Sequence, residues 1–348
     1  MSQNFESTTL WQHGKDGYSL YHVFSLVATK NAVLAFAEAR QGGKDADETH
    51  DIVMRRSTDG GQTFEKSVCL FGGGRCLVNP TPIWDAITER MLLFFAEYLE
   101  NKRTVLYLSH SDDEGVSWSE PRDLTHAITK KNDTTFHLPG PSHGIQLQKS
   151  PQTGRLLLQL WHRGTDVTLP RTARGYCASL LYSDDHGEHW NHIPALGHAL
   201  CAIESALCET DEGVLWALRS FGTQHAMTKS ADGGVTWSEV QILPLAPAFA
   251  CQAGVVSLPS TQISPQTVLL SRVSRPEKEC RRDMEICASY DGGKTFPTHL
   301  PLPVGDATPG YSDLCAVDGG DTVGLLHCHE GQVLFTRIPA RAYIEKSG

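Results

Sequence analysis

The sequence lacks the segments that direct a chain into or across a membrane. Its N-terminus has no basic stretch followed by an apolar one, and no later apolar run is long enough to span a bilayer. These absences predict an intracellular, cytoplasmic protein, or one from which a leader was removed. The formal net charge of −10 disfavours nucleic acid and anionic membrane surfaces as partners. A small anionic ligand would therefore need arginines gathered at its site.

Metal-binding spacings are also missing. The ten cysteines include no Cys-x-x-Cys pair, and the sixteen histidines include no His-Glu-x-x-His pattern. Cys177, Cys287 and Cys328 lie in apolar, strand-like runs, so we expect them to be reduced core residues.

One acidic loop alternates as a calcium-binding loop does, beginning at Asp45. Its sixth position, which needs glycine, is His50, and its twelfth, which needs glutamate, is Arg56. The sequence therefore predicts neither a metal site nor another cofactor.

Helical periodicity is nearly absent, whereas short runs rich in β-forming residues are numerous. The clearest of these expected strands are 33–37, 51–54, 91–95, 105–108, 155–160, 214–218, 268–270 and 333–335. No Pro/Ser-rich linker or charge block separates them. We therefore expect one all-β domain that spans residues 1–348.

One phrase, Ser-x-Asp-x-Gly-x-(Thr/Ser/His)-(Trp/Phe), occurs five times. The copies begin at Ser57, Ser111, Ser183, Ser230 and Ser289. Ser and Asp side chains bond to nearby backbone groups, Gly adopts positive φ, and the aromatic residue returns to the hydrophobic layer. The phrase thus predicts a hairpin repeated once per structural unit, typical of propellers. A residue set repeated in every unit does not mark one unique pocket.

The repeat resembles the Asp-box, or bacterial neuraminidase repeat, of sialidases. The resemblance covers most of the chain, because three further segments look like family signatures: Glu38-Ala39-Arg40, Asn79-Pro80-Thr81-Pro82 and Gly140-Pro141-Ser142-His143. It implies a six-bladed β-propeller of four-stranded blades, with the Asp-box hairpins at the periphery. It also implies an exo-glycosidase whose substrate is a small anionic sugar or a glycoconjugate.

Sialidases hold the substrate carboxylate with three arginines, since the guanidinium fork suits a planar carboxylate. Arg219 matches the second of these arginines, and Arg281 matches the third. If the motif is aligned one residue later, Arg282 is the third instead. The first is absent, because His22 stands where the family has arginine. A histidine donates one hydrogen bond when neutral and is charged only below its pKa, about 6.5 when unperturbed. A weaker or differently shaped grip is expected, unless His22 only packs in the core.

The nucleophile pair of the family is retained. Gly310-Tyr311-Ser312-Asp313-Leu314 resembles the tyrosine motif, and Glu204 occupies the place of its glutamate partner. A neutral tyrosine approaches an anomeric carbon that bears a carboxylate more readily than a carboxylate nucleophile does.

The resemblance places the acid/base in the loop after Arg40, a residue that we assign to substrate binding. Asp45 is the best match and Asp47 the second. Such a residue must close over the glycosidic oxygen and have its pKa raised. Trp161 and Arg163 fall where sialidases line the glycerol or aglycone side, and Arg163 is a possible substitute for the missing arginine.

Three functions remain open. The first is a retaining exo-hydrolase of sialic acids. The second is a hydrolase of another ulosonic acid, such as 3-deoxy-octulosonic acid (Kdo) or deaminated neuraminic acid. The second is considered because His22 replaces the first arginine of the triad. The third is a non-catalytic, glycan-binding propeller. Retention of Tyr311 with Glu204 speaks against the third, since a binding module needs no activated phenol.

Overall fold

A computed structural model gives the structure of the chain. It describes residues 5–43, 45, 48–99, 103–128, 136–149, 151–163, 176–193, 203–219, 224–248, 251–258, 266–274, 281, 283–302 and 310–343. Helix within these ranges is limited to three short 3-10 turns, at Thr125–Ala127, Asp318–Gly320 and Ala340–Tyr343. No helix of the described part is long and apolar enough to cross a membrane.

The strands of the described residues form five sheets. The largest has eight strands: β2 (Leu20–Ala28), β3 (Val33–Arg40), β4 (His50–Ser57), β5 (Val68–Phe71), β6 (Cys76–Asp85), β7 (Arg90–Tyr98), β8 (Thr104–Ser111) and β9 (Arg122–Asp123). The next has five: β10 (His137–Pro139), β11 (Ile145–Gln146), β12 (Leu156–Arg163), β13 (Tyr176–Ser183) and β14 (Asn191–Ile193).

Each of the other sheets has four strands. They are β15 (Ile203–Thr210), β16 (Gly213–Arg219), β17 (His225–Ser230) and β18 (Gln241–Ile242); β19 (Gly254–Ser257), β20 (Val268–Val273), β21 (Met284–Ser289) and β22 (Thr298–Pro301); and β1 (Glu6–Gln12) with β23 (Ser312–Val317), β24 (Thr322–His329) and β25 (Gln332–Pro339). The runs that the sequence analysis expected to be extended all fall within or overlap these strands, so the all-β prediction is confirmed.

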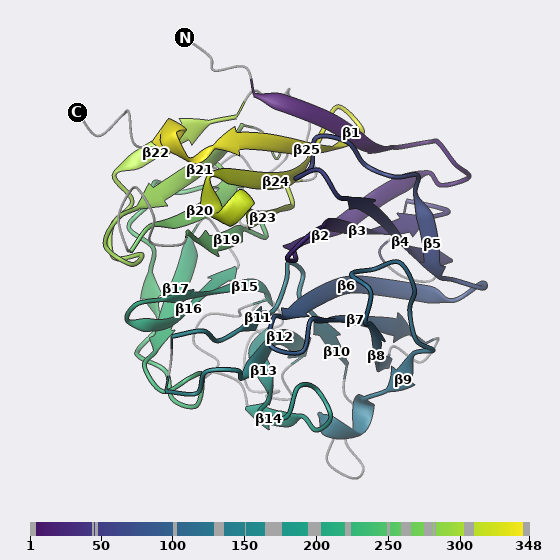
Figure 1. Cartoon of the computed structure of the whole chain (residues 1–348), viewed down its shortest axis with the longest axis horizontal. Helices are drawn as coiled ribbons and strands as arrows, with labels where there is room; N and C mark the ends of the chain where they lie inside the picture. Colours follow the sequence, from purple (N-terminus) through teal and green to yellow (C-terminus); the bar gives the residue numbers. More distant parts are fainter. Residues whose placement is uncertain are drawn as a thin grey trace.

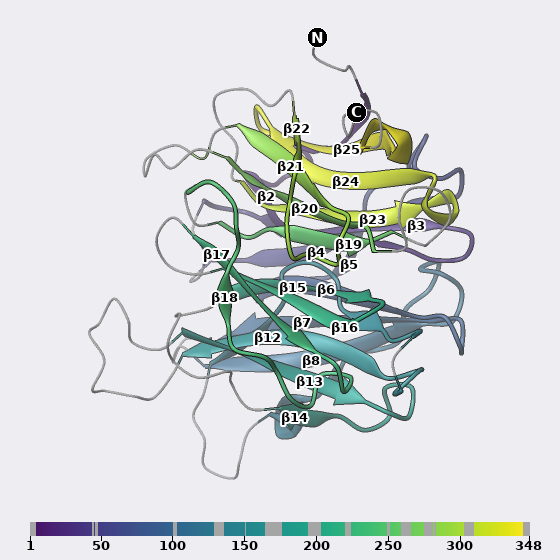
Figure 2. The same cartoon turned by 90° about the vertical axis from the view of Figure 1, so that its left-hand side faces the viewer.

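The sheets are arranged around a central axis like the blades of a propeller (Figure 1). Their first strands lie next to one another, because β2 contacts β6 and β23, while β19 contacts β15 and β23. In the side view of Figure 2, β17 and β18 run along the outside of the body. The first strands therefore surround the axis, and residues at their ends can meet there although they are far apart in sequence.

The N-terminal strand belongs to the C-terminal sheet. β1 pairs antiparallel with β25 at the sheet edge, from Glu6↔Arg337 to Gln12↔Gln332 (Figure 1). Leu10 and Trp11 of β1 are buried in the same hydrophobic cluster as Phe335. This pairing closes the ring of sheets.

The five repeats form the same hydrogen-bond network, and each begins at the last residue of the third strand, in pairing order, of a sheet or half-sheet. In the first copy, Ser57 Oγ donates to Asp59 Oδ1 over 2.7 Å, and Gly61 N donates to Ser57 Oγ over 2.8 Å. Thr63 donates to Asp59 from its backbone N over 2.9 Å and from its hydroxyl over 2.6 Å. The repeat connects the third strand to the outermost one, which confirms the hairpin that the sequence predicted.

The repeats also set the spacing between neighbouring sheets. The aromatic residue that ends the first copy, Phe64, lies 5.0 Å from Phe335 of the C-terminal sheet, and Trp118 of the second lies 6.0 Å from Phe36 of β3, measured between ring centroids. The fifth position is glycine in all five copies because a Cβ there would approach the adjacent sheet: at Gly61 it would lie 2.2 Å from Phe335.

We predict that Gly115→Ala destabilises the protein more than a substitution at a glycine of similar backbone geometry. Gly115 has φ +89°, and a Cβ there would lie 2.3 Å from Cδ2 of Leu34, a fully buried side chain. Gly73 has φ +90° with no atom within 4 Å of the added carbon. Gly73→Ala should cost about 1–2 kcal/mol for left-handed backbone, and Gly115→Ala about 1–3 kcal/mol more for overpacking. Urea unfolding measures the stability of both variants. Equal midpoints would show that the glycine of the repeat does not set the distance between neighbouring sheets.

Three first strands carry a β-bulge near the axis. The pairing register shifts after His22 in β2, after Val78 in β6 and after Ile203 in β15. At each shift one residue other than glycine adopts positive φ: Val23 (49°), Asn79 (57°) and Glu204 (49°). Such backbone is costly, most of all for a β-branched residue, and a bulge redirects the neighbouring side chains.

Candidate active site

Tyr311, Glu204 and Arg219 form a connected chain of side chains. Tyr311 Oη donates a hydrogen bond to Glu204 Oε1, and the other carboxylate oxygen of Glu204 forms an ion pair with Nη1 of Arg219. Tyr311 directly precedes β23, Glu204 lies in the bulge of β15, and Arg219 ends β16, where it faces Ile203. The structure thus brings the three residues together across 107 positions of sequence.

The surroundings of Tyr311 keep its phenol protonated. Burial raises the pKa of Tyr311 to about 12, although the positive charges of Arg219 and Arg281 oppose this shift. The ring is only 6% exposed. A phenol in this state becomes a nucleophile only as a base removes its proton, and Glu204 is already hydrogen-bonded to that proton.

Positively charged and neutral donors surround the same ring. The Arg281 guanidinium carbon lies 5.4 Å from the centroid of the Tyr311 ring, and the His22 ring lies 4.4 Å from it in an edge-on arrangement. The structure therefore gathers Arg219, Arg281 and His22 about one tyrosine. Such a set of donors suits an anionic group of a ligand.

His22 is neutral at this position. Burial lowers the pKa of His22 well below its ordinary value, and the charges of Arg40, Arg281, His13 and Arg219 lower it further. Its Nδ1 is buried and has no hydrogen-bond partner among the described residues. A neutral imidazole at this position adds no positive charge to the group of donors around Tyr311.

Arg40 and Asp45 are held together at the start of the acidic loop. Arg40 donates to Glu38 Oε2 over 2.9 and 2.7 Å and to Asp45 Oδ1 over 2.6 Å. Burial alone would lower the pKa of Arg40, but the charge of Glu38 and the bonds to Asp45 outweigh it and raise the pKa. Glu38 also accepts from the Asn79 backbone over 2.7 Å. The Asp45 side chain is 93% exposed, so this arrangement leaves it open to water.

Of the four remaining predicted site residues, only Trp161 has a side chain in the described part of the structure. Trp161 is 9% exposed and packs against Phe136, with ring centroids 5.3 Å apart, so most of its surface belongs to the core. Arg163 is the last residue of β12, and its side chain lies outside the described part. Asp47 and Arg282 also lie outside the described residues. The roles given to these four residues stay predictions.

The sequence analysis missed the role of Asp313. The carboxylate of Asp313 is completely buried and accepts hydrogen bonds from the backbone N of Leu26 over 2.8 Å and from the Ser142 hydroxyl. His143 Nδ1 lies 3.1 Å away, and although burial alone would lower its pKa, Asp313 raises it. Asp313 thus joins β2 and the loop before β11 to the strand that follows Tyr311. The sequence offered two signals of this role: Asp313 lies in the motif around Tyr311, and it is an acid inside an apolar strand.

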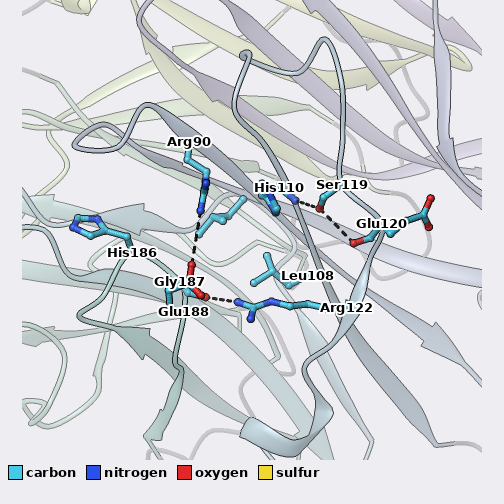
Figure 3. A pocket seen from close by; sticks show the side chains of 10 residues that line it. Arg90, Leu108, His110, Ser119, Glu120, Arg122, His186, Gly187 and Glu188 are labelled. Carbon is cyan, nitrogen blue, oxygen red and sulfur yellow. Dashed lines mark hydrogen bonds and ion pairs between the residues drawn. The ribbon is translucent and has the colours of Figure 1, made fainter.

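Two of the cavities in the described part of the chain differ in their distance from the axis. One of about 540 Å³ begins at the end of the Asp45 loop, and Glu48, Arg75, Cys76, Glu97 and Tyr98 are among the residues that line it. Another, of about 190 Å³, lies at the periphery between β7, β8 and the third repeat (Figure 3).

The arginines of the peripheral cavity already have partners. Arg90 Nε donates to Asp112 over 2.7 Å. Arg122 donates to the Gly187 carbonyl, as Figure 3 shows. We assign no chemistry to this cavity.

Comparison with known proteins gives consistent matches. The model of the BNR repeat-like domain matches residues 31–328. Sialidase-3 of Bos taurus is 30% identical over 289 residues, which cover 74% of this chain and 65% of that protein. The sialidase of Micromonospora viridifaciens is 27% identical over 343 residues, covering 90% of this chain and 50% of that protein. This chain therefore spans less than two thirds of the length of these curated relatives.

A solved sialidase structure is also similar to this chain. The Hadza microbial sialidase Hz136 superposes with a TM-score of 0.85 at 25% sequence identity, covering 97% of this chain and 69% of the other.

Proposed function

This chain belongs to the BNR repeat-like domain family within the sialidase superfamily, and from that premise we propose that it is a retaining exo-glycosidase. Its substrate would be a glycoconjugate with a terminal, α-ketosidically linked sialic acid or related ulosonic acid. The observation that carries the proposal is the hydrogen bond from Tyr311 to Glu204 beside two arginines.

The proposed reaction has two displacements. Glu204 accepts the phenol proton as Tyr311 Oη bonds to the anomeric carbon, and Asp45 donates a proton to the departing glycosidic oxygen. Asp45 then removes a proton from water, whose oxygen attacks the same carbon. The bond to Tyr311 breaks and Glu204 returns the proton to the phenol. Two inversions give net retention of configuration.

The substrate carboxylate would bind between Arg219, Arg281 and His22. The two arginines supply charge-assisted hydrogen bonds, and the free Nδ1 of His22 supplies one neutral bond. Because Asp45 protonates the leaving oxygen, the leaving group would extend toward the cavity of about 540 Å³ at the end of its loop. The presence of His22 in place of arginine makes Kdo or deaminated neuraminic acid the alternative substrate.

We also propose that the propeller has six blades. Four sheets count as one blade each. The eight-stranded sheet would count as two, β2–β5 and β6–β9, because a single parallel pair, His50↔Cys76, joins its halves. Each half carries its own repeat between its third and its outermost strand, as the sheets β10–β14, β15–β18 and β19–β22 do.

A panel of fluorogenic glycosides of N-acetylneuraminic acid, deaminated neuraminic acid and Kdo tests the function. We expect the wild type to cleave at least one member, with weak activity on the N-acetylneuraminic substrate. His22→Arg should raise kcat/KM for that substrate about 10- to 100-fold, because a charge-assisted contact contributes about 1.5–3 kcal/mol. Since His22 is neutral, lowering the assay pH to just below 6.5 should not reproduce this gain.

The same exchange at the peripheral residue His110, His110→Arg, is the control, and it should leave every rate unchanged. An unchanged substrate ranking in His22→Arg would exclude His22 as a carboxylate ligand. Failure to cleave any member would favour the glycan-binding propeller instead.

A further inference from the structure

Three potential metal ligands meet on the outer strands of the sheet β19–β22. Glu285 and Cys287 are two residues apart on β21 and therefore point to the same face. His299 of β22 is the cross-strand partner of Cys287. One ligand atom from each side chain, Sγ, Nδ1 and a carboxylate oxygen, lies within 4.8 Å of the other two.

Two of the three separations match edges of a tetrahedral zinc site. Cys287 Sγ lies 3.5 Å from His299 Nδ1, and that nitrogen lies 3.1 Å from Glu285 Oε2. With Zn–S near 2.3 Å and Zn–N or Zn–O near 2.0–2.1 Å, a tetrahedron places S and N about 3.5 Å apart and N and O about 3.3 Å apart. We propose that Glu285, Cys287 and His299 bind a zinc ion.

His299 Nδ1 lies between two neighbours in this cluster. His299 Nδ1 faces both the thiol and the carboxylate, yet a single ring nitrogen either donates one hydrogen bond or accepts one. A zinc ion bonds to all three ligand atoms, and the thiol proton leaves to solvent as the Zn–S bond forms.

The neighbourhood orients the ligands for this role. Arg272 holds Glu285 Oε1 through Nε at 2.8 Å and Nη2 at 2.7 Å, which leaves Oε2 directed at His299. A carboxylate fixed by an outer partner in this way is usual for metal ligands. Cys287 is completely buried, whereas the His299 side chain is 40% exposed, so an ion can enter from solvent and a water molecule can complete the coordination.

Sulfur, nitrogen and oxygen donors together favour zinc over calcium or magnesium, which prefer oxygen alone. The site is separate from Tyr311 and Glu204, so the proposal does not depend on the proposed hydrolase activity.

The test is a titration of the whole chain after treatment with a chelator. Zinc is added in competition with a chromophoric chelator, and cobalt is added separately because a Co–thiolate bond gives a charge-transfer absorption. We expect one tight equivalent of zinc, a thiolate band with cobalt and a rise in Tm with zinc. His299→Ala, at an exposed position, and Cys287→Ser should each weaken binding at least tenfold, and Cys287→Ser should remove the cobalt band.

Two controls address the many other cysteines and histidines. Cys69→Ser changes an exposed cysteine, and His189→Ala changes an exposed histidine of the third repeat. Neither should alter the tight equivalent. The proposal is overturned if no tight equivalent exists, or if a folded His299→Ala protein binds zinc as the wild type does.

Discussion

Tyr311→Phe is expected to lower kcat by about three to six powers of ten, because one hydroxyl provides the whole nucleophile. The substitution keeps the ring that packs against His22 and Arg281. Glu204 loses one hydrogen bond but retains its ion pair with Arg219. The fold should therefore persist, with a loss of stability of about 1–3 kcal/mol at most. Steady-state kinetics on the best substrate of the panel and thermal unfolding measure the two effects separately.

Tyr290→Phe provides the control. Tyr290 donates a hydrogen bond to Thr298 Oγ1 over 3.0 Å on the outer strand β22, away from Tyr311. Its removal should leave kcat unchanged. NMR of the wild-type reaction should show the α-anomer as the first product, and a β-anomer first, or near-normal turnover in Tyr311→Phe, would contradict the nucleophile assignment.

Arg219→Met is expected to lower kcat/KM by about two to four powers of ten. Breaking a partly buried ion pair by removing one partner costs about 3–5 kcal/mol. Methionine fills much of the same volume but leaves the Glu204 carboxylate without its cation. The pKa of Tyr311 should rise further, since Arg219 opposes the effect of burial on it. Both kcat and KM should suffer, because Arg219 acts on the catalytic pair and on the substrate carboxylate.

Arg90→Met is the comparison for this substitution. Arg90 pairs with Asp112 over 2.7 Å at the periphery, so its loss removes an arginine–carboxylate pair without touching the axis. The kinetic constants of Arg90→Met should equal those of the wild type. An effect of Arg219→Met on KM alone would show that Arg219 binds substrate but does not act on Glu204.

The repeat and the central strands could be predicted because their signals are local. Each copy of the repeat needs only eight consecutive residues, and strands such as β7 and β12 are apolar enough to stand out. The short outer strands β9, β14 and β18 are two or three residues long and largely exposed, so no apolar pattern marks them.

The bulges could not be predicted for a different reason. Positive φ is normally indicated by glycine, but it falls here on Val23, Asn79 and Glu204, where tertiary contacts hold the backbone against its local preference. The cluster of Glu285, Cys287 and His299 was missed because metal spacings are sought along the chain, whereas His299 joins across a strand pair. The active-site pair was found only through its resemblance to a family motif.

The pairing of β1 with β25 has a consequence for the order of folding. Ser7 and Thr336, which bond across this pair, are 329 positions apart, so the contact forms only after nearly the whole chain has been synthesised. Closing a disordered loop of that length costs about 5 kcal/mol in entropy, and the cost falls once the intervening sheets have assembled and brought the ends near. We expect the ring to close late in folding. Until then β25 is an open sheet edge that carries buried residues such as Phe335, and such edges favour pairing between chains.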